Sequence, residues 1–183
     1  EMGKYHGVAD HAQRLFHEPV DAQSRILYAT ENGEVVATAR STWGGDGPIP
    51  QRMIDQYDLA PFLAELPASA ISVGERGMVA PRLRGTDLFL RLIGRSLRFA
   101  NEHRIQLCFG DCEPHLLNLY LGLGQRTYAK RNVNSAEAGY LIPIVYCLVA
   151  SLATWLLGFG GVPNNEFVRT TAETLGLTGT PDW

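Results

Sequence analysis

The segment at residues 78–92, MVAPRLRGTDLFLRL, carries the first indication of chemistry in this chain. An apolar run turns through Pro81 and Gly85 and then takes up helical spacing, which predicts a strand that feeds a helix through a tight turn. Such a junction directs unpaired backbone N–H groups and the positive end of the helix at one place, which ordinarily suits a phosphate. Asp87 adds a negative charge there. The junction therefore disfavours a highly charged ligand, unless Asp87 only caps the helix.

Metal chemistry is not predicted. Cys108, Cys112 and His115 have ligand atoms, but zinc sites normally pair cysteines at closer spacing and add a fourth ligand.

The three cysteines are odd in number, and the start of the chain has no positively charged segment leading into an apolar signal core. We therefore expect a reducing, cytoplasmic location.

Length and charge limit the classes of protein to consider. A chain of 183 residues can bury a sizeable core, and we expect residues 1–183 to form one domain. Sixteen Lys and Arg against 19 Asp and Glu leave a formal net charge of -3, which does not favour a nucleic-acid partner.

The elements that position these side chains follow from local patterns. The runs RILYAT and EVVATARS flank Glu31, Asn32 and Gly33, which predicts a β-hairpin with an Asn-Gly turn. A helix is predicted over Tyr5–Phe16, and a second helical segment, interrupted at Pro61, over QRMIDQYDLAPFLAEL.

The second half of the chain alternates strands and helices. ISVGERGMVAP predicts a strand with a glycine bulge, Thr86–Glu102 an amphipathic helix, RIQLCFGD a strand, and EPHLLNLYLGLG a short helix ended by Gly124. A strand is predicted to follow from Tyr140. This order predicts an α/β sheet in which a hairpin joins a parallel strand–helix–strand unit.

The stretch Tyr140–Val162 has no charged residue and is long enough to cross a bilayer. Pro143, the β-branched and aromatic residues over 142–146 and the terminal glycines favour a buried strand followed by an apolar helix or loop. Membrane association stays as the alternative, and with it a non-catalytic protein anchored by residues 140–162.

Two separated stretches resemble the GNAT superfamily of acyltransferases, in which a strand leads into a Q/R-x-x-G-x-G/A loop that cradles acyl-coenzyme A. Arg82, Arg84, Gly85 and Thr86 match this loop, with Asp87 at its last position. NLYLGLG resembles the family's Tyr-x-x-x-Gly segment. The resemblance implies a GNAT-like mixed central sheet with a splayed parallel strand pair, flanked by helices.

GEVVATARS and GERGMVAP resemble, more particularly, the acyl-homoserine lactone synthases and the related long-chain N-acyl amino acid synthases, of the N-acyl tyrosine type. Met78 stands near the position where the lactone synthases carry a second Arg, which favours the amino acid synthases. Arg40 and Glu75 match the family's site positions. We predict that Arg40, Trp43 and Val79 bind the substrate.

Amide formation requires an amine freed of its proton, a thioester held beside it and a proton for the departing sulfur. The resemblance implies Glu75 as the base and Tyr120 as the acid. A bulge-side ion pair for Glu75, a buried hydroxyl for Tyr120 and a structural ion pair for Arg40 are the competing interpretations.

The predicted donor is the acyl-phosphopantetheine of acyl carrier protein, bound at Arg82, Arg84, Gly85, Thr86 and Asp87, with no permanently bound cofactor. Arg91, Arg95 and Arg98 fall opposite the apolar face of their helix and are predicted to dock the acidic carrier protein, although a solvated helix face also explains them. The predicted enzyme is an N-acyltransferase whose acceptor is an amino acid, with tyrosine first. An acyl-CoA-dependent small-molecule N-acetyltransferase and an acyl-homoserine lactone synthase are the alternatives.

Overall fold

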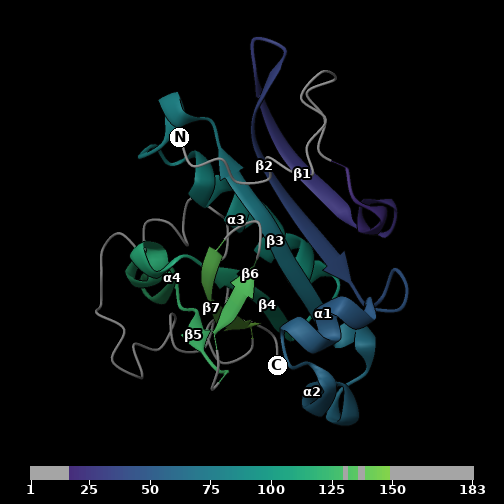
Figure 1. Cartoon of the computed structure of the whole chain (residues 1–183). Coiled ribbons are helices and arrows are strands. Elements are labelled where there is room, and N and C mark those ends of the chain that lie inside the picture. The colour runs from purple at the N-terminus through teal and green to yellow at the C-terminus, as the bar shows by residue number, and fades with distance from the viewer. Residues whose placement is uncertain (1–16, 130–131, 136–138, 149–183) are drawn as a thin grey trace.

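The computed structural model describes residues 17–129, 132–135 and 139–148 (Figure 1). In this part of the chain, seven strands form a mixed sheet in the order β1-β2-β3-β4-β7-β5, and β6 pairs with β7 off this path. The strands are β1 (Arg25–Glu31), β2 (Glu34–Trp43), β3 (Ile71–Val79), β4 (Leu107–Cys112), β5 (Arg126–Thr127), β6 (Val133–Ser135) and β7 (Gly139–Cys147).

The predicted hairpin is formed by β1 and β2, which pair antiparallel and project beyond the rest of the sheet (Figure 1). Asn32 and Gly33 at its tip have φ values of 51° and 81°. Two successive residues with positive φ match the right-handed twist of the flanking strands, and Asn-Gly adopts this conformation at little cost.

Short helices connect β2 to β3. A 3-10 turn, η1 (Pro19–Gln23), lies earlier in the chain, before β1. The predicted helical segment divides into α1 (Gln51–Gln56) and α2 (Ala60–Glu65), because Pro61 has no N–H and is tolerated only in a first turn. A 3-10 turn, η2 (Ala68–Ala70), leads into β3. The core under these helices contains Val20, Ile49, Met53, Tyr57, Leu59, Ile71, Val73 and Phe109.

The helix α3 (Leu88–Glu102) connects β3 to the parallel strand β4, as predicted. It begins two residues later than expected, because the Thr86 hydroxyl donates to the Leu83 carbonyl and accepts from the Leu88 N–H at the turn. Its buried positions are Leu92, Gly94, Leu97 and Ala100, which recur at helical spacing. The helix covers one face of the sheet and directs its first turn toward the end of β3 (Figure 1).

The parallel strands β3 and β4 pair over a short distance and then part. The register covers Ile71–Val73 against Leu107–Phe109, although β3 continues to Val79 and β4 to Cys112. In the same region β3 has one extra residue opposite β2, since Thr38 and Arg40 face Met78 and Glu75. The predicted bulge and the predicted splayed strand pair are therefore both present, and the fold class is confirmed.

The last described elements are a 3-10 turn, η4 (Pro114–Leu116), the helix α4 (Leu117–Gly122) and β7. Gly124 follows α4 with a φ of 92°, as its predicted role at the helix end requires. β5 and β6, each of three residues or fewer, were not predicted because such short strands have no detectable periodicity.

The apolar run from Tyr140 forms β7 up to Cys147, as predicted. Its remainder, like the helix predicted over Tyr5–Phe16, lies outside the described residues. No helix within the described ranges has the length and hydropathy needed to cross a membrane.

Candidate active site

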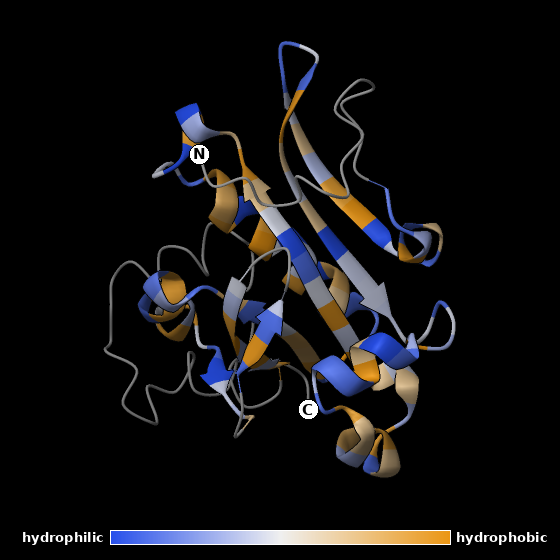
Figure 2. Ribbon diagram, in the orientation of Figure 1, coloured by the Kyte–Doolittle hydropathy of each residue, from blue (hydrophilic) through white to orange (hydrophobic). Residues whose placement is uncertain are grey.

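A buried arginine on β2 organises a group of charged residues beside β3. Arg40, on β2, has only 3% of its side chain exposed, and its two terminal nitrogens bind three carboxylates. Nη1 donates to Glu18 Oε2 at 2.5 Å and to Asp21 Oδ1 at 2.7 Å, and Nη2 donates to Glu75 Oε2 at 2.6 Å. Glu75 lies directly opposite Arg40 in the β2–β3 register, and Figure 2 shows the hydrophilic residues of the two strands side by side.

The segment before β1 delivers the other two carboxylates of this ion network. Glu18 precedes η1 and forms a capping box with Asp21, whose side chain accepts from the Glu18 N–H at 2.8 Å. Burial raises the pKa of Glu18, but Arg40 and Arg76 outweigh it and hold that pKa below its ordinary value. Burial also opposes ionisation of Asp21, and the Glu18 N–H and Arg40 overcome it, so the pKa of Asp21 is lowered.

A tyrosine hydroxyl connects the two parted strands. Tyr57 is the residue that follows α1. Its hydroxyl donates to Asp111 Oδ2 on β4 at 2.7 Å, and its oxygen lies 3.2 Å from Glu75 Oε1 on β3. Burial, followed by the charges of Asp111 and Glu75, raises the pKa of Tyr57 well above its ordinary value. Burial likewise raises the pKa of Asp111. One hydroxyl hydrogen thus serves two carboxylates, an arrangement that can take up a proton at one carboxylate and pass it to the other.

Trp43 and Val79 lie away from this network. Trp43 is three residues beyond Arg40 on β2 and therefore points to the opposite face of the sheet. Its indole N–H donates to the Ser69 carbonyl at 2.7 Å, and its ring packs edge-on against Phe99 of α3. Val79 ends β3 opposite Ala37 and immediately precedes the loop. The structure does not bring Trp43 together with Glu75.

The loop before α3 has the predicted strand–turn–helix form. It contains a 3-10 turn, η3 (Pro81–Leu83), and Gly85 with a φ of 83°. The N–H groups of Arg84 and Thr86 donate within the turn, whereas the Gly85 N–H has no hydrogen-bond partner in the described part of the chain. Arg82 pairs with Glu31 at the hairpin tip, and the Arg84 Nε donates to the Val79 carbonyl at 3.3 Å.

Asp87 occupies the N-cap position of α3, but its predicted capping hydrogen bond is absent from the described structure. Its carboxylate instead accepts from Arg91 at 2.8 Å, one helical turn further on. The capping interpretation was wrong, because a backbone in the helical region (φ -74°, ψ -1°) turns the side chain away from the free N–H groups. Arg91, Arg95 and Arg98 are all exposed on α3.

Tyr120 lies on α4 with its ring edge-on to Phe89 of α3, at a centroid distance of 5.8 Å. Burial, followed by the charges of Cys112 and Asp111, raises the pKa of its hydroxyl. No hydrogen bond from the described residues reaches this hydroxyl. The structure therefore places Tyr120 on the Asp111 side of the parted strands, with a hydroxyl that is protonated at neutral pH.

The cysteines do not form a metal site in the described region, where no group of three or more His, Cys, Asp or Glu side chains could hold a metal ion. Burial raises the pKa of the Cys108 thiol to about 11, and burial with the neighbouring Asp111 raises that of Cys112 to about 11. Both thiols are therefore protonated at neutral pH.

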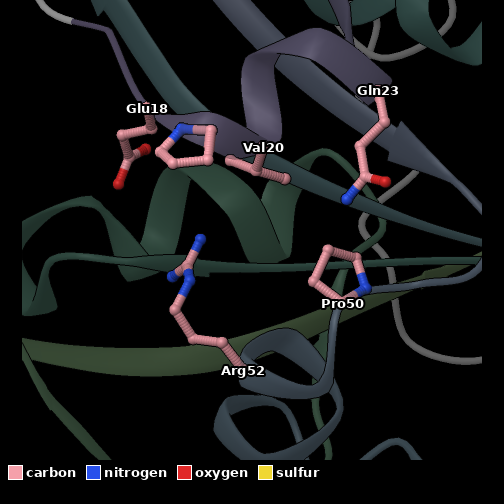
Figure 3. A pocket seen from close by; sticks show the side chains of 6 residues that line it. Glu18, Val20, Gln23, Pro50 and Arg52 are labelled. Carbon is pink, nitrogen blue, oxygen red and sulfur yellow. The ribbon is translucent and has the colours of Figure 1, made fainter.

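A pocket of about 490 Å³ opens beside the ion network, between η1 and the start of α1 (Figure 3). Arg52 reaches from α1 toward Glu18 on the opposite wall, and Pro19 also lines the pocket. Its Nη2 lies 3.6 Å from Glu75 Oε2, so this lining residue connects the pocket to the carboxylate predicted as the base.

Sequence reasoning missed Glu18, Asp21, Tyr57 and Asp111. Tyr57 lies at helical spacing from Met53 and so belongs to an apolar face, which hides a polar role. Asp111 had a usable signal, because it ends an apolar strand that runs parallel to the strand of Glu75. The acidic pair at 18 and 21 had no signal before the fold brought it to Arg40.

Comparison with known proteins gives a structural answer alone: no protein-family model and no curated protein sequence matches the chain. Among solved structures, BjaI, a CoA-dependent acyl-homoserine lactone synthase with MTA, matches with a TM-score of 0.64 and 14% identity over 96% of this chain and 75% of that chain. MesI, another CoA-dependent acyl-homoserine lactone synthase, matches with a TM-score of 0.57 and 17% identity over 93% of this chain and 79% of that chain.

FeeM, an N-acyl amino acid synthase from uncultured soil microbes, matches with a TM-score of 0.60 and 14% identity over 70% of this chain and 75% of that chain. At such identities the likeness establishes the fold. The chain therefore has the GNAT-like fold of these N-acyl synthases, as its sequence predicted.

Proposed function

We propose that this chain is an N-acyltransferase that joins a long-chain fatty acyl group, carried as a thioester on acyl carrier protein, to the amine of an amino acid, with tyrosine as the first candidate acceptor. The observation that carries the proposal is the pair of carboxylates, Glu75 and Asp111, held by one tyrosine hydroxyl where β3 and β4 part. A thioester is already activated, so the protein has mainly to orient two substrates and remove a proton.

In the proposed reaction, Glu75 takes the proton from the acceptor ammonium, and the free amine attacks the thioester carbon. The C–N bond forms, the C–S bond breaks, the attacking nitrogen loses its second proton and the sulfur gains one, so the products are the amide, the free thiol and one released proton. Arg40 holds Glu75 through a 2.6 Å hydrogen bond, which fixes the position of the base. Tyr57 and Asp111 offer the proton a route away from Glu75. Tyr120 is the predicted proton donor to the sulfur.

The proposed donor lies along the loop from Arg82 to Asp87, with its phosphodiester near the Gly85 N–H and the first turn of α3. An unpaired N–H beside a helix N-terminus favours an anion. The exposed arginines of α3 continue from this loop and offer a docking surface to an acidic carrier protein in the cytoplasm.

A second candidate is acyl-homoserine lactone synthesis from an acyl-CoA donor. It is favoured by the solved structures of BjaI and MesI, both of which are described as CoA-dependent acyl-homoserine lactone synthases. Against it, Asp87 places a carboxylate beside the loop, and a pyrophosphate brings more negative charge to that carboxylate than a single phosphodiester does.

The test is mass spectrometry of lipid extracts from cells that express the chain, with the empty vector as the baseline and Glu75→Gln as the matched inactive variant. We expect N-acyl amino acids with long saturated or monounsaturated chains from the wild type alone. Purified protein is then given the same acyl chain on carrier protein and on coenzyme A. Acetylated products alone would refute the long-chain assignment, and acyl-homoserine lactones would establish the second candidate.

A further inference from the structure

We propose that Arg52 binds the carboxylate of the acceptor amino acid in the pocket between η1 and α1, so that the enzyme selects free α-amino acids over amines that lack a carboxylate. This inference rests on the proposed N-acyltransferase function and deepens it. It gives the substrate-binding role predicted for Arg40 to a different arginine.

The two arginines that face Glu75 differ in how much of each guanidinium remains available. Arg40 is 3% exposed, and three carboxylates lie within hydrogen-bonding distance of its terminal nitrogens. A substrate carboxylate would have to displace one of them and enter the core of the sheet. Arg40 therefore acts as a positioning residue for Glu75.

Arg52 has 51% of its side chain exposed and lines the pocket. Among the described residues it makes one hydrogen bond, from Nη1 to Gln56 Oε1 at 3.1 Å, and its 3.6 Å approach to Glu75 is too long to be a second. A guanidinium has five N–H donors arranged to match a carboxylate. Arg52 is thus paired with Glu75 through Nη2 only at ion-pair distance, and its half-exposed guanidinium has further N–H donors for an incoming carboxylate.

The charges around the pocket also favour a zwitterion. Four carboxylates take part in the network, on Glu18, Asp21, Glu75 and Asp111, against the three guanidiniums of Arg40, Arg52 and Arg76. With all groups ionised, one negative charge remains, which attracts an ammonium group. An α-amino acid places its ammonium beside its carboxylate, and Glu75 and Arg52 offer the complementary charges 3.6 Å apart.

The remaining walls of the pocket suit an uncharged side chain. Pro19, Val20 and Pro50 contribute apolar surface, and Gln23 contributes an amide (Figure 3). The volume of about 490 Å³ falls within the range of small-molecule sites. An aromatic or aliphatic amino acid would bury its side chain against the two prolines and present its amine to Glu75.

The experiment compares Arg52→Gln with the wild type on two acceptors: the amino acid of highest turnover among the twenty, and the amine formed when that amino acid loses its carboxylate. Because a hydrogen bond to a charged group is worth about ten- to hundredfold in affinity, we expect KM for the amino acid to rise by that factor in the variant. KM for the amine should stay near the wild-type value, and any change in kcat should be the same for both acceptors. Arg52→Lys should recover part of the loss.

Arg126→Gln is the matched control, since Arg126 is exposed on β5 and donates to the Gln125 carbonyl, away from the pocket. An unchanged KM for the amino acid in Arg52→Gln would overturn the inference, as would an equal rise in KM for the amine. Calorimetric binding of the amino acid and the amine to the donor-free protein separates this result from the function. If the wild type forms no amide but binds the amino acid through Arg52, the proposed function fails and only the assignment of Arg52 as a carboxylate-binding residue stands.

Discussion

Glu75, Tyr57 and Asp111, the polar groups where β3 and β4 part, each have at least one charged neighbour. These neighbours fix where each group can accept or donate a proton. Glu75 accepts from Arg40 through one oxygen and faces the Tyr57 hydroxyl with the other. Arg40 therefore holds the carboxylate in a fixed position, with one oxygen directed at the Tyr57 hydroxyl. The competing interpretation of Glu75 as an ion-pair partner is thus realised, and the proposed role of Glu75 as a base is compatible with it.

Glu75→Gln should lower kcat by about a hundredfold or more, the usual contribution of a general base, because the amide cannot accept the ammonium proton. Tyr120→Phe should slow turnover less, since a thiolate can leave without much help. Turnover with the preferred donor and acceptor measures both effects. Glu65→Gln, on the exposed end of α2, is the matched control and should keep wild-type turnover. Near-normal turnover in Glu75→Gln would remove this residue from its proposed role.

Asp111→Asn should stabilise the protein at neutral pH. Burial raises the folded-state pKa of Asp111, so the folded state binds a proton more tightly than the unfolded chain does. The wild type is therefore most stable below the unfolded-state pKa and loses stability as pH rises through the folded-state pKa, whereas Asn has no such loss. Urea unfolding of both proteins across this range measures the difference, and Asn keeps an oxygen acceptor for Tyr57. A stability difference between the two proteins that does not grow with pH would contradict the raised pKa of Asp111 in the folded state.

At the scale of elements, two glycines mark where the parallel strands part. Gly74 follows the last paired residue of β3, and Gly110 follows that of β4. A Cβ on Gly110 would lie 3.0 Å from the Gly74 carbonyl oxygen, closer than ordinary contact, whereas a Cβ on Gly74 would lie 3.7 Å from the Phe109 carbonyl oxygen. The backbones approach closely at one position and leave room at the other.

Gly110→Ala should lower the free energy of unfolding by about 1–3 kcal/mol, because a backbone oxygen cannot move aside as a flexible side chain does. Gly74→Ala is the matched variant, with the same added methyl in ordinary contact. It should lie within about 1 kcal/mol of the wild type. Denaturant midpoints at constant m-value measure both. Equal losses in the two variants would show that the close approach at Gly110 does not matter.

The exposed face of α3 gives a prediction about the donor. Replacing Arg91, Arg95 and Arg98 together with Glu should raise KM for acyl carrier protein and flatten its salt dependence, since the attraction to an acidic partner is lost. The triple Gln variant should show a smaller rise. Acyl-CoA carrying the same chain serves as the control donor, and wild type and Asp87→Gly are assayed beside the variants. Carrier-protein kinetics that ignore the reversed charges would exclude α3 as the docking surface.

At the scale of the whole molecule, one aromatic cluster joins the helices after β2 to the strands that carry the site. Phe109 on β4 is 1% exposed and packs edge-on against Phe62 of α2 and Tyr128, at centroid distances of 4.8 and 5.1 Å. The Tyr128 hydroxyl donates to the Tyr57 carbonyl at 2.7 Å. The core thus fixes the position of Tyr57 between the two strands.

Phe109→Ala should destabilise the protein by about 3–5 kcal/mol, the usual cost of an emptied aromatic core position. Tyr28→Ala, which removes a ring that is 64% exposed on β1, should cost far less. Chemical denaturation of the purified variants measures both costs. If the two variants lost similar stability, the cluster around Phe109 would not be the core of this fold.

The sequence by itself determined the longer elements and their order, whereas β5 and β6 were too short to be predicted. The Asn-Gly turn, the helical spacing of α3 and the apolar runs of β3, β4 and β7 are local signals, and each formed the element it predicted. A parallel strand–helix–strand unit next to a hairpin leaves few possible sheets, so the fold class followed as well. The matches at Arg40 and Glu75 also identified two members of the ion network, although not their partners.

Only the tertiary structure decided which side chains meet. Glu18 and Asp21 reach Arg40, and Tyr57 reaches Asp111, across 18 or more intervening positions of the chain. Such contacts depend on strand register, and one extra residue in β3 changes which side chains share a face. The choice between Arg40 and Arg52 has the same origin: burial and neighbouring charge distinguish two arginines that look alike in the sequence, and both properties come from the packing of distant segments.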